Sequence, residues 1–231
     1  MPTYHIYLDS RERIAGPPCQ PSFVLSNSII GVKSVEVRSF HFANTLYNVD
    51  DHNNTLETSN GVITMPPGFY SATDFVANLE SLLQLHSSWA QTHLTLTQAT
   101  NQLQWTLPPM FSILGGSMID IVGYYGANTT QLVLAGPHAI QVQCQELQTH
   151  ARNVTARRTG SGDGTLNPLF MAPVSVGFGA MENYDPAYRM AHQYSHGILN
   201  RLNFSLSDAR TGRLLTELTT WSIIFIVVVN D

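Results

Sequence analysis

The chain has 231 residues, of which 43% are hydrophobic but only 12% are charged, about half the charged share of an average soluble domain. Its formal net charge is −5, Lys33 is the only lysine, and the nearest approach to a basic patch is Arg152, Arg157 and Arg158. This excludes a domain that holds nucleic acid through its phosphates, which needs a basic stripe, and the spread of aromatic and β-branched residues excludes a disordered chain.

The N-terminal part of the chain predicts three strands. They cover residues 4–8, 23–25 and 32–42, and the third alternates apolar and polar residues with a period of two. After Ser39 the apolar phase flips, and because one extra residue turns every following side chain to the other face, we expect a bulge or corner there. A long bent strand of this kind lets one segment serve two sheets of a sandwich.

Two hairpins are predicted in the next hundred residues. The first joins residues 55–58 to residues 62–65 through Asn60-Gly61, a dipeptide that supplies the positive φ angles of a tight turn. The second joins residues 94–96 to residues 103–107 through a turn at 99–101. Both are typical of an antiparallel β protein.

One helix is predicted between the hairpins. Ser71 or Thr73 is a suitable N-cap, and Asp74 suits the first turn. The apolar residues recur at helical spacing at Phe75, Val76, Leu79, Leu82 and Leu83. A helix with one apolar face is expected to lie against the sandwich.

The remainder of the chain predicts further short strands. These are residues 132–134, 140–144, 174–178, 198–206 and 214–218, with a helical turn at 118–124 and a turn at 208–212. The last strand, residues 223–229, is an uninterrupted β-branched run, and such a run is typical of a central strand buried on both faces.

These elements predict the fold class. No linker or internal repeat divides the chain, so residues 1–231 are expected to form one domain, an all-β single jelly-roll: a two-sheet antiparallel sandwich with one or two short helices. Residues 221–229 are too few to span a bilayer, and the N-terminus has no signal-peptide pattern. Cys19 and Cys144 do not make a disulfide framework, and Cys144 is expected to be a buried free thiol in a protein that folds inside the cell.

Nine histidines raise the question of a metal site. His192 and His196 are spaced i, i+4, which would place both on one face of a helix. The zincin pattern needs a glutamate after the first histidine, and Gln193 stands there instead. A cupin-like metalloenzyme, the third hypothesis for this chain, would need a close His-x-His pair, which does not occur. No metal ligand and no cofactor is therefore predicted.

Other reactive clusters have simpler interpretations. Asp50-Asp51-His52 combines acid and base but continues into a solvated turn. Gly160-x-Gly162-x-Gly164 is not followed by Lys-Ser/Thr and so does not predict a phosphate loop. Residues 157–164 are expected to form an exposed loop, which also accounts better for Arg152, Arg157 and Arg158 than contact with a packaged genome. With no nucleophile elbow either, we predict no catalytic residue and no enzyme activity.

The order of several motifs resembles a known family. The motifs are Tyr-Leu-Asp-Ser-Arg at 7–11, the strand at 30–39, Asn-Thr-Leu-Tyr-Asn-Val at 44–49, the hairpin after Asn53-Asn54, Gly-Phe-Tyr-Ser at 68–71, Val-Gly-Tyr at 122–124, Cys-Gln-Glu-Leu at 144–147 and residues 204–213. In this order they resemble the minor capsid (penton) proteins of virophages, polinton-like elements, adomaviruses and related double-stranded DNA viruses. The resemblance covers nearly the whole chain.

The resemblance implies a structural role. It implies a single jelly-roll that forms homopentamers at the five-fold vertices of an icosahedral virion, beside a double jelly-roll major capsid protein. A vertex spike or an internal cement protein would be a further partner, and no specific nucleic acid and no membrane span is implied. The family has no catalytic residues to carry over. No long insertion for receptor binding is apparent in this sequence, yet a virion spike or lectin-like receptor-binding β-sandwich remains the alternative.

Overall fold

The computed structural model describes residues 2–87, 92–107, 112–124, 126, 129–148, 168–186 and 191–230, with backbone only at residues 86, 87, 120, 148 and 191–196. Contacts divide the chain into two compact units, one formed by Met1–Leu46 with Pro137–Asp231 and the other by Tyr47–Gly136. The second unit is a continuous segment of the chain, which follows β2 and precedes β9 of the first unit.

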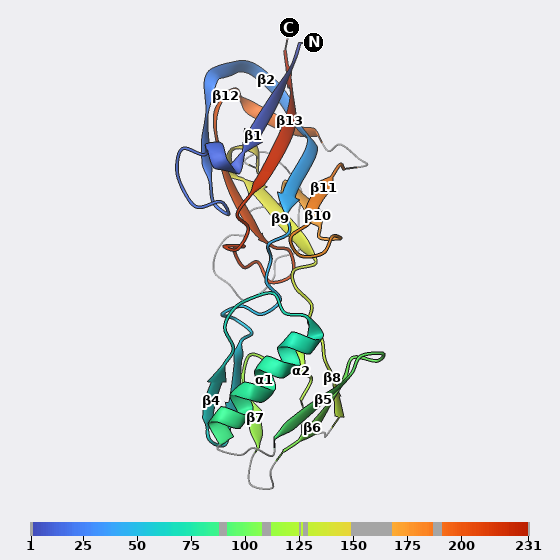
Figure 1. Ribbon diagram of the computed structural model, residues 1–231. Coiled ribbons are helices and arrows are strands. Elements are labelled where there is room, and N and C mark those ends of the chain that lie inside the picture. The colour runs from blue at the N-terminus through green and yellow to red at the C-terminus, as the bar shows by residue number, and fades with distance from the viewer. Residues whose placement is uncertain are drawn as a thin grey trace. The chain divides into compact units, whose positions relative to one another are not determined.

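The first unit is an antiparallel β structure. Its seven-stranded sheet has the order β1-β13-β2-β12-β9-β10, and β11 also pairs with β2. The strands are β1 (Thr3–Asp9), β2 (Ser22–Ala43), β9 (Ala139–Cys144), β10 (Phe170–Pro173), β11 (Met181–Tyr184), β12 (Ala191–Asp208) and β13 (Trp221–Val229), with short helices η1 (Ser10–Glu12) and α3 (Gln145–Gln148). Both termini lie at one end of this unit, because Thr3 pairs with Val228 (Figure 1).

The sheet folds over itself into two layers. Strands β12 and β13 are not hydrogen-bonded neighbours. Even so, the Phe204 ring centroid on β12 lies 5.7 Å from that of Trp221 and 6.0 Å from that of Phe225, both on β13. Side chains of the two layers therefore meet face to face in one core, as in a sandwich. The prediction of an all-β two-layer antiparallel fold is confirmed.

The long strands β2 and β12 supply both layers. Strand β2 runs through Ser26-Asn27-Ser28, so the two strands predicted at 23–25 and 32–42 are one element. The predicted irregularity near Ser39 is confirmed, since Ile224 pairs with Ser39 and Phe225 with Val37, which leaves Arg38 as an extra residue. Gly31 has a φ of 72°, a left-handed conformation that favours glycine, within β2.

Strand β13 has one buried face, which corrects the expectation of burial on both. Residues of one face are fully buried: Trp221, Ile223, Phe225, Val227 and Val229. Ile224, Ile226 and Val228 alternate with them and are half-buried. The expected interior position is confirmed, because β13 lies between β1 and β2.

Three of the shorter predicted strands are misplaced. Residues 174–178 form a loop between β10 and β11, because the buried Glu182 carboxylate accepts hydrogen bonds from the Ser175 N–H (2.7 Å) and the Val176 N–H (3.1 Å). Residues 214–218 contribute only an isolated bridge between Ser207 and Leu214. In place of the strand expected at 132–134, the structure has β8 (Thr129–Gln131), which ends one residue before the expected strand begins.

The second unit combines two small sheets with helices. One sheet has the order β4-β3-β7 and the other β5-β6-β8. Their strands are β3 (Thr55–Thr58), β4 (Gly61–Thr64), β5 (His93–Thr97), β6 (Gln102–Thr106), β7 (Ile113–Gly115) and β8, accompanied by α1 (Ala72–Ser87) and α2 (Ile119–Val122). Both predicted hairpins and the helical turn are confirmed. In the first hairpin Gly61, not Asn60, has the positive φ.

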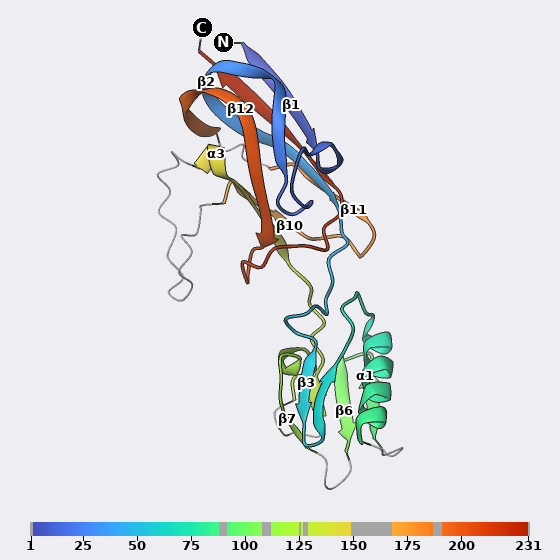
Figure 2. The ribbon, with the colours of Figure 1, turned by 90° about the vertical axis from the view of Figure 1, so that its left-hand side faces the viewer.

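Helix α1 forms as predicted but belongs to the second unit. The Ser71 hydroxyl accepts a hydrogen bond from the Asp74 N–H (3.1 Å) and so caps the helix. Phe75, Leu79 and Leu83 are fully buried in a hydrophobic cluster with residues of β3, β4, β5 and β6. The helix thus covers the strands of the second unit (Figure 2), whereas the sequence predicted that it would lie against the sandwich. No helix in the described part of the chain combines the length and hydropathy needed to cross a bilayer.

Candidate functional site

The motif at residues 7–11 forms a corner where β1 ends. The buried Asp9 carboxylate accepts hydrogen bonds from the Arg11 backbone N–H (2.9 Å) and from the Arg11 guanidinium at Nε (2.9 Å) and Nη2 (2.6 Å). The next residue, Ser10, is fully buried, and its hydroxyl accepts a hydrogen bond from the Trp221 N–H (3.0 Å). The motif therefore joins the end of β1 to the start of β13, which is a structural role.

This corner predicts an acid-sensitive contribution to stability. The hydrogen bonds from Arg11 lower the pKa of Asp9 from 3.8 to about 2. A lowered pKa means that the contribution is present above pH 3.8 and is lost as the pH falls towards 2. In Asp9→Asn we expect the free energy of unfolding at pH 7 to fall by about 1–2 kcal/mol. This is less than the whole pKa shift would give, because Arg11 is exposed and solvent screens its interaction with Asp9.

Chemical denaturation at a series of pH values measures this effect. The difference between the parent and Asp9→Asn is expected to shrink between about pH 4 and pH 2, whereas Asp51→Asn, at an exposed position, is expected to follow the parent throughout. A constant difference across that interval would contradict the assignment of the lowered pKa to Asp9.

The motifs at 44–49 and 68–71 contact each other. The buried Asn48 side chain donates to the Tyr70 carbonyl (2.8 Å) and accepts from the Tyr70 N–H (2.9 Å), and Val49 forms an isolated bridge with Gly68. Asp50 accepts from the His52 N–H (2.8 Å), so this acid–base cluster is a turn, as the sequence predicts. The contacts fix the beginning of the second unit.

The motifs at 144–147 and 204–213 are also adjacent. Cys144 pairs with Phe204, and Glu146 accepts a hydrogen bond from the Asn203 N–H (2.7 Å). Asp208 holds the predicted turn by accepting from the Arg210 N–H (2.9 Å) and the Thr211 hydroxyl (2.7 Å). Spacing in the sequence indicated these motifs, but not that they meet in pairs.

The two cysteines are free and buried, as predicted for Cys144. Burial raises the pKa of the Cys144 thiol far above its usual range, and burial likewise raises the pKa of Cys19. A thiol that stays protonated is a poor nucleophile and a poor metal ligand. Both cysteines therefore act as small apolar core residues.

The structure places His192 and His196 in a strand, not in a helix. The backbone of His192 and His196 lies in β12, where four residues span about 13 Å, so the helical spacing that suggested a shared site does not apply. Across the described ranges no three His, Cys, Asp or Glu side chains gather closely enough to hold a metal ion. Arg152, Arg157, Arg158 and the glycines at 160, 162 and 164 lie outside the described residues.

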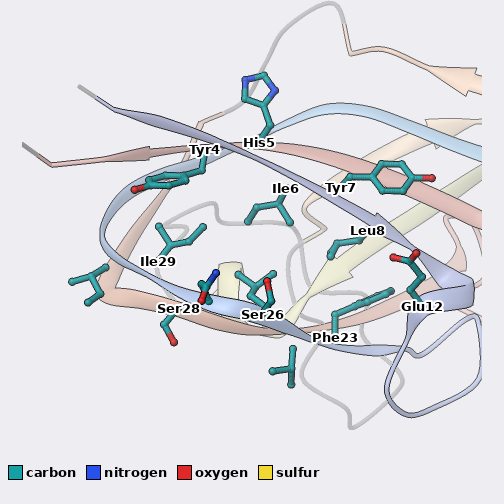
Figure 3. Close-up of a pocket in the computed structure, with 14 residues that line it drawn as sticks. Tyr4, His5, Ile6, Tyr7, Leu8, Glu12, Phe23, Ser26, Ser28 and Ile29 are labelled. Carbon is teal, nitrogen blue, oxygen red and sulfur yellow. The ribbon is translucent and has the colours of Figure 1, made fainter.

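An open groove of about 730 Å³ lies between β1 and the first half of β2. Ile6 and Leu8 point from β1 towards Phe23 on β2, and all three side chains are buried (Figure 3). Tyr4 is 49% exposed at the rim beside Ile29, and Glu12 lies at the other end. Among the described residues of the lining, Glu12 is the one carboxylate and none is lysine or arginine. The sequence did not predict this groove, because its walls come from two segments predicted as ordinary strands.

No family model matches the chain, and no curated protein matches it either. Among solved structures, the chain is similar to the selenomethionine-labelled mavirus penton protein, with a TM-score of 0.52 and 10% sequence identity. The match covers 98% of this chain and 100% of the mavirus chain, so it includes both units. The resemblance to virophage penton proteins is confirmed in three dimensions, and the chain has the fold of the mavirus penton protein.

Proposed function

We propose that this chain is a structural penton protein that forms homopentamers at the five-fold vertices of an icosahedral virion. The observation that carries the proposal is the end-to-end match to the mavirus penton protein, which spans the sandwich and the inserted unit alike. Both units would act together as one capsid subunit over residues 1–231. The protein would function by assembly, without catalytic, cofactor-binding or metal-binding residues.

The surface chemistry supports repeated contact between copies. The outer face of the β5-β6-β8 sheet carries neutral hydrogen-bonding side chains and one histidine: His93, Thr95, Thr97, Gln102, Gln104, Thr106, Thr129 and Gln131. When identical subunits crowd around an axis, like charges meet at each symmetric contact and repel one another. A face whose only ionisable side chain is His93, in a chain with only 12% charged residues, reduces this cost.

Ring formation requires a particular kind of interface. A contact between two different surfaces of the same chain closes into a ring when the rotation between neighbours suits it. A five-membered ring would then sit beside a double jelly-roll major capsid protein, with a spike or an internal cement protein as a further partner. We place the assembled protein in the virion, after synthesis inside the host cell.

The mass of the purified protein tests self-association. We expect native mass spectrometry to show a species of five times the 25.5-kDa chain, in equilibrium with the monomer. Raised salt is expected to leave the ring largely intact, because contacts between neutral surfaces are screened little. A dominant dimer or trimer that persists on dilution would contradict the proposal, because a ring of five subunits cannot be built from whole dimers or whole trimers.

A further inference from the structure

The outer edge of β1 has a free row of backbone hydrogen-bonding groups. The Val229 N–H donates to the Pro2 carbonyl (3.3 Å), and hydrogen-bonded pairs alternate along an antiparallel ladder. The N–H and C=O groups of Ile6 and Leu8 therefore face β13, whereas those of His5 and Tyr7 face the opposite side. Among the described residues no strand pairs with that side, since β1 ends the sheet order.

The free edge adjoins the apolar groove between β1 and β2. Tyr4, Ile6 and Leu8 project from alternate positions of β1 to the groove side, while His5 points away (Figure 3). The opposite wall, in the first half of β2, adds the buried Phe23 and the partly buried Leu25, which share one face of the strand. A strand added to β1 would place every second side chain over this apolar lining, and it would find backbone partners at the same spacing.

This edge lacks the features that usually prevent pairing with other chains. Edge strands are commonly protected by lysine, by an inward charge, by a bulge or by proline within the strand. β1 has seven residues, pairs with β13 in an unbroken register, and has no lysine or proline between Thr3 and Asp9. Asp9 is engaged by Arg11 at the end of the strand. We expect an unprotected edge of this length to pair with another segment when the protein functions.

We propose that β1 is a docking site for an extended segment of a different protein chain, which adds a strand to the sheet and fills the groove. The row of free amides and carbonyls selects a polypeptide, because only an extended backbone offers complementary groups at this period. The alternating lining selects apolar side chains at every second position. An antiparallel guest would have its N-terminal end beyond Asp9. Glu12 lines the groove at that end and favours a basic residue there.

The guest is not β1 of a second copy. Two β1 edges paired antiparallel would relate the copies by a two-fold axis, and such an isologous contact closes as a dimer. Such a pairing would occupy the β1 edge of both copies, and it would not produce a ring. The exclusion of β1 of a second copy rests on the proposed ring, whereas the free edge and the groove that carry the docking site do not depend on pentamer formation.

Binding of a synthetic peptide to the purified full chain tests this inference. The probe is a capped peptide of about eight residues, with valine and threonine alternating after an N-terminal lysine. Two versions carry N-methyl groups on alternate amides, one set on the nitrogens that would face β1 and the other on the nitrogens that would face solvent. We expect the second version to bind like the parent peptide and the first to bind at least about tenfold more weakly, because several backbone hydrogen bonds are lost.

Two proline variants provide the matched comparison on the protein. His5→Pro removes an N–H that faces away from β13, so the internal ladder is kept while the docking edge is blocked. Val62→Pro is the matched control on β4, an edge strand of the second unit. The Met65 N–H donates to the Asn54 carbonyl (2.9 Å), so in the alternating ladder the Val62 N–H faces outwards and its loss leaves the ladder intact. We expect His5→Pro to lose peptide binding and Val62→Pro to retain it, with thermal unfolding of both close to that of the parent.

Charge at the groove end gives an independent readout. A peptide with glutamate in place of lysine is expected to bind more weakly to the parent, and Glu12→Gln is expected to reduce that difference between the two peptides. The inference is overturned if the lysine peptide shows no saturable binding up to about 1 mM, if both N-methylated versions bind equally, or if folded His5→Pro binds like the parent. Dimers of the parent that His5→Pro abolishes would also overturn it, by placing a second copy on this edge.

Discussion

Replacement of Trp221 by alanine is expected to lower the free energy of unfolding of the first unit by about 3–5 kcal/mol. The side chain is 1% exposed and lies between the two layers, with its ring centroid 5.9 Å from those of Phe23 and Phe40. Its indole N–H donates to the Pro18 carbonyl (2.7 Å), so the change removes a buried hydrogen bond as well as a large apolar volume. Urea denaturation followed by circular dichroism measures the loss.

A control on the same strand separates the two faces of β13. Ile224→Ala removes a half-buried side chain from the other face and is expected to cost about 1 kcal/mol. Equal effects of the two substitutions would contradict the finding that one face of β13 forms the core. They would instead support burial of both faces, as the sequence alone suggested.

Replacement of Phe75 by alanine is expected to destabilise the second unit by about 3–5 kcal/mol while the first unit keeps its stability. Phe75 is fully buried in the cluster of the second unit, where its ring makes an edge contact with Tyr70 at 6.3 Å. The two units have separate hydrophobic clusters, so each can form a cooperative unit of its own. Native-state hydrogen exchange measures the opening of each unit within one molecule.

The pattern of amide hydrogen exchange distinguishes independent unfolding of the two units from joint unfolding. In Phe75→Ala we expect amides of α1 and β3 to exchange faster and those of β13 to be unchanged, with Trp221→Ala giving the reverse. Leu85→Ala, on the same helix but 81% exposed, is expected to change stability by no more than about 0.5 kcal/mol. Equal acceleration of both units in either core variant would show that they unfold as one.

Local sequence patterns predicted the elements that have one solvent-exposed face and one buried face. Hairpin β5–β6 alternates exposed Thr95 and Gln104 with buried Leu94 and Leu103, and α1 repeats its buried residues at helical spacing, so sequence and structure agree. In β13 every residue of the apolar run is a plausible core residue. The sequence could not show which alternate set is buried, because that depends on the layer packed against it.

Long-range contacts decided the features that the sequence did not predict. The boundaries of the second unit carry no linker composition, since Leu46 and Val49 are buried and Asn48 is bonded to Tyr70. The loop at 174–178 has strand-like residues, but the carboxylate of Glu182 takes the Ser175 and Val176 N–H groups that a strand partner would use. The groove beside β1 likewise depends on two segments that meet only in the folded protein.

Imaging of intact virus particles tests the central proposal most directly. A cryo-electron microscopy reconstruction at a resolution that traces side chains is expected to place five copies of this chain around each five-fold axis, with Trp221 and Phe204 in the core of every copy. Density for this chain confined to a peripheral spike, or five-fold vertices built from another protein, would contradict the penton assignment.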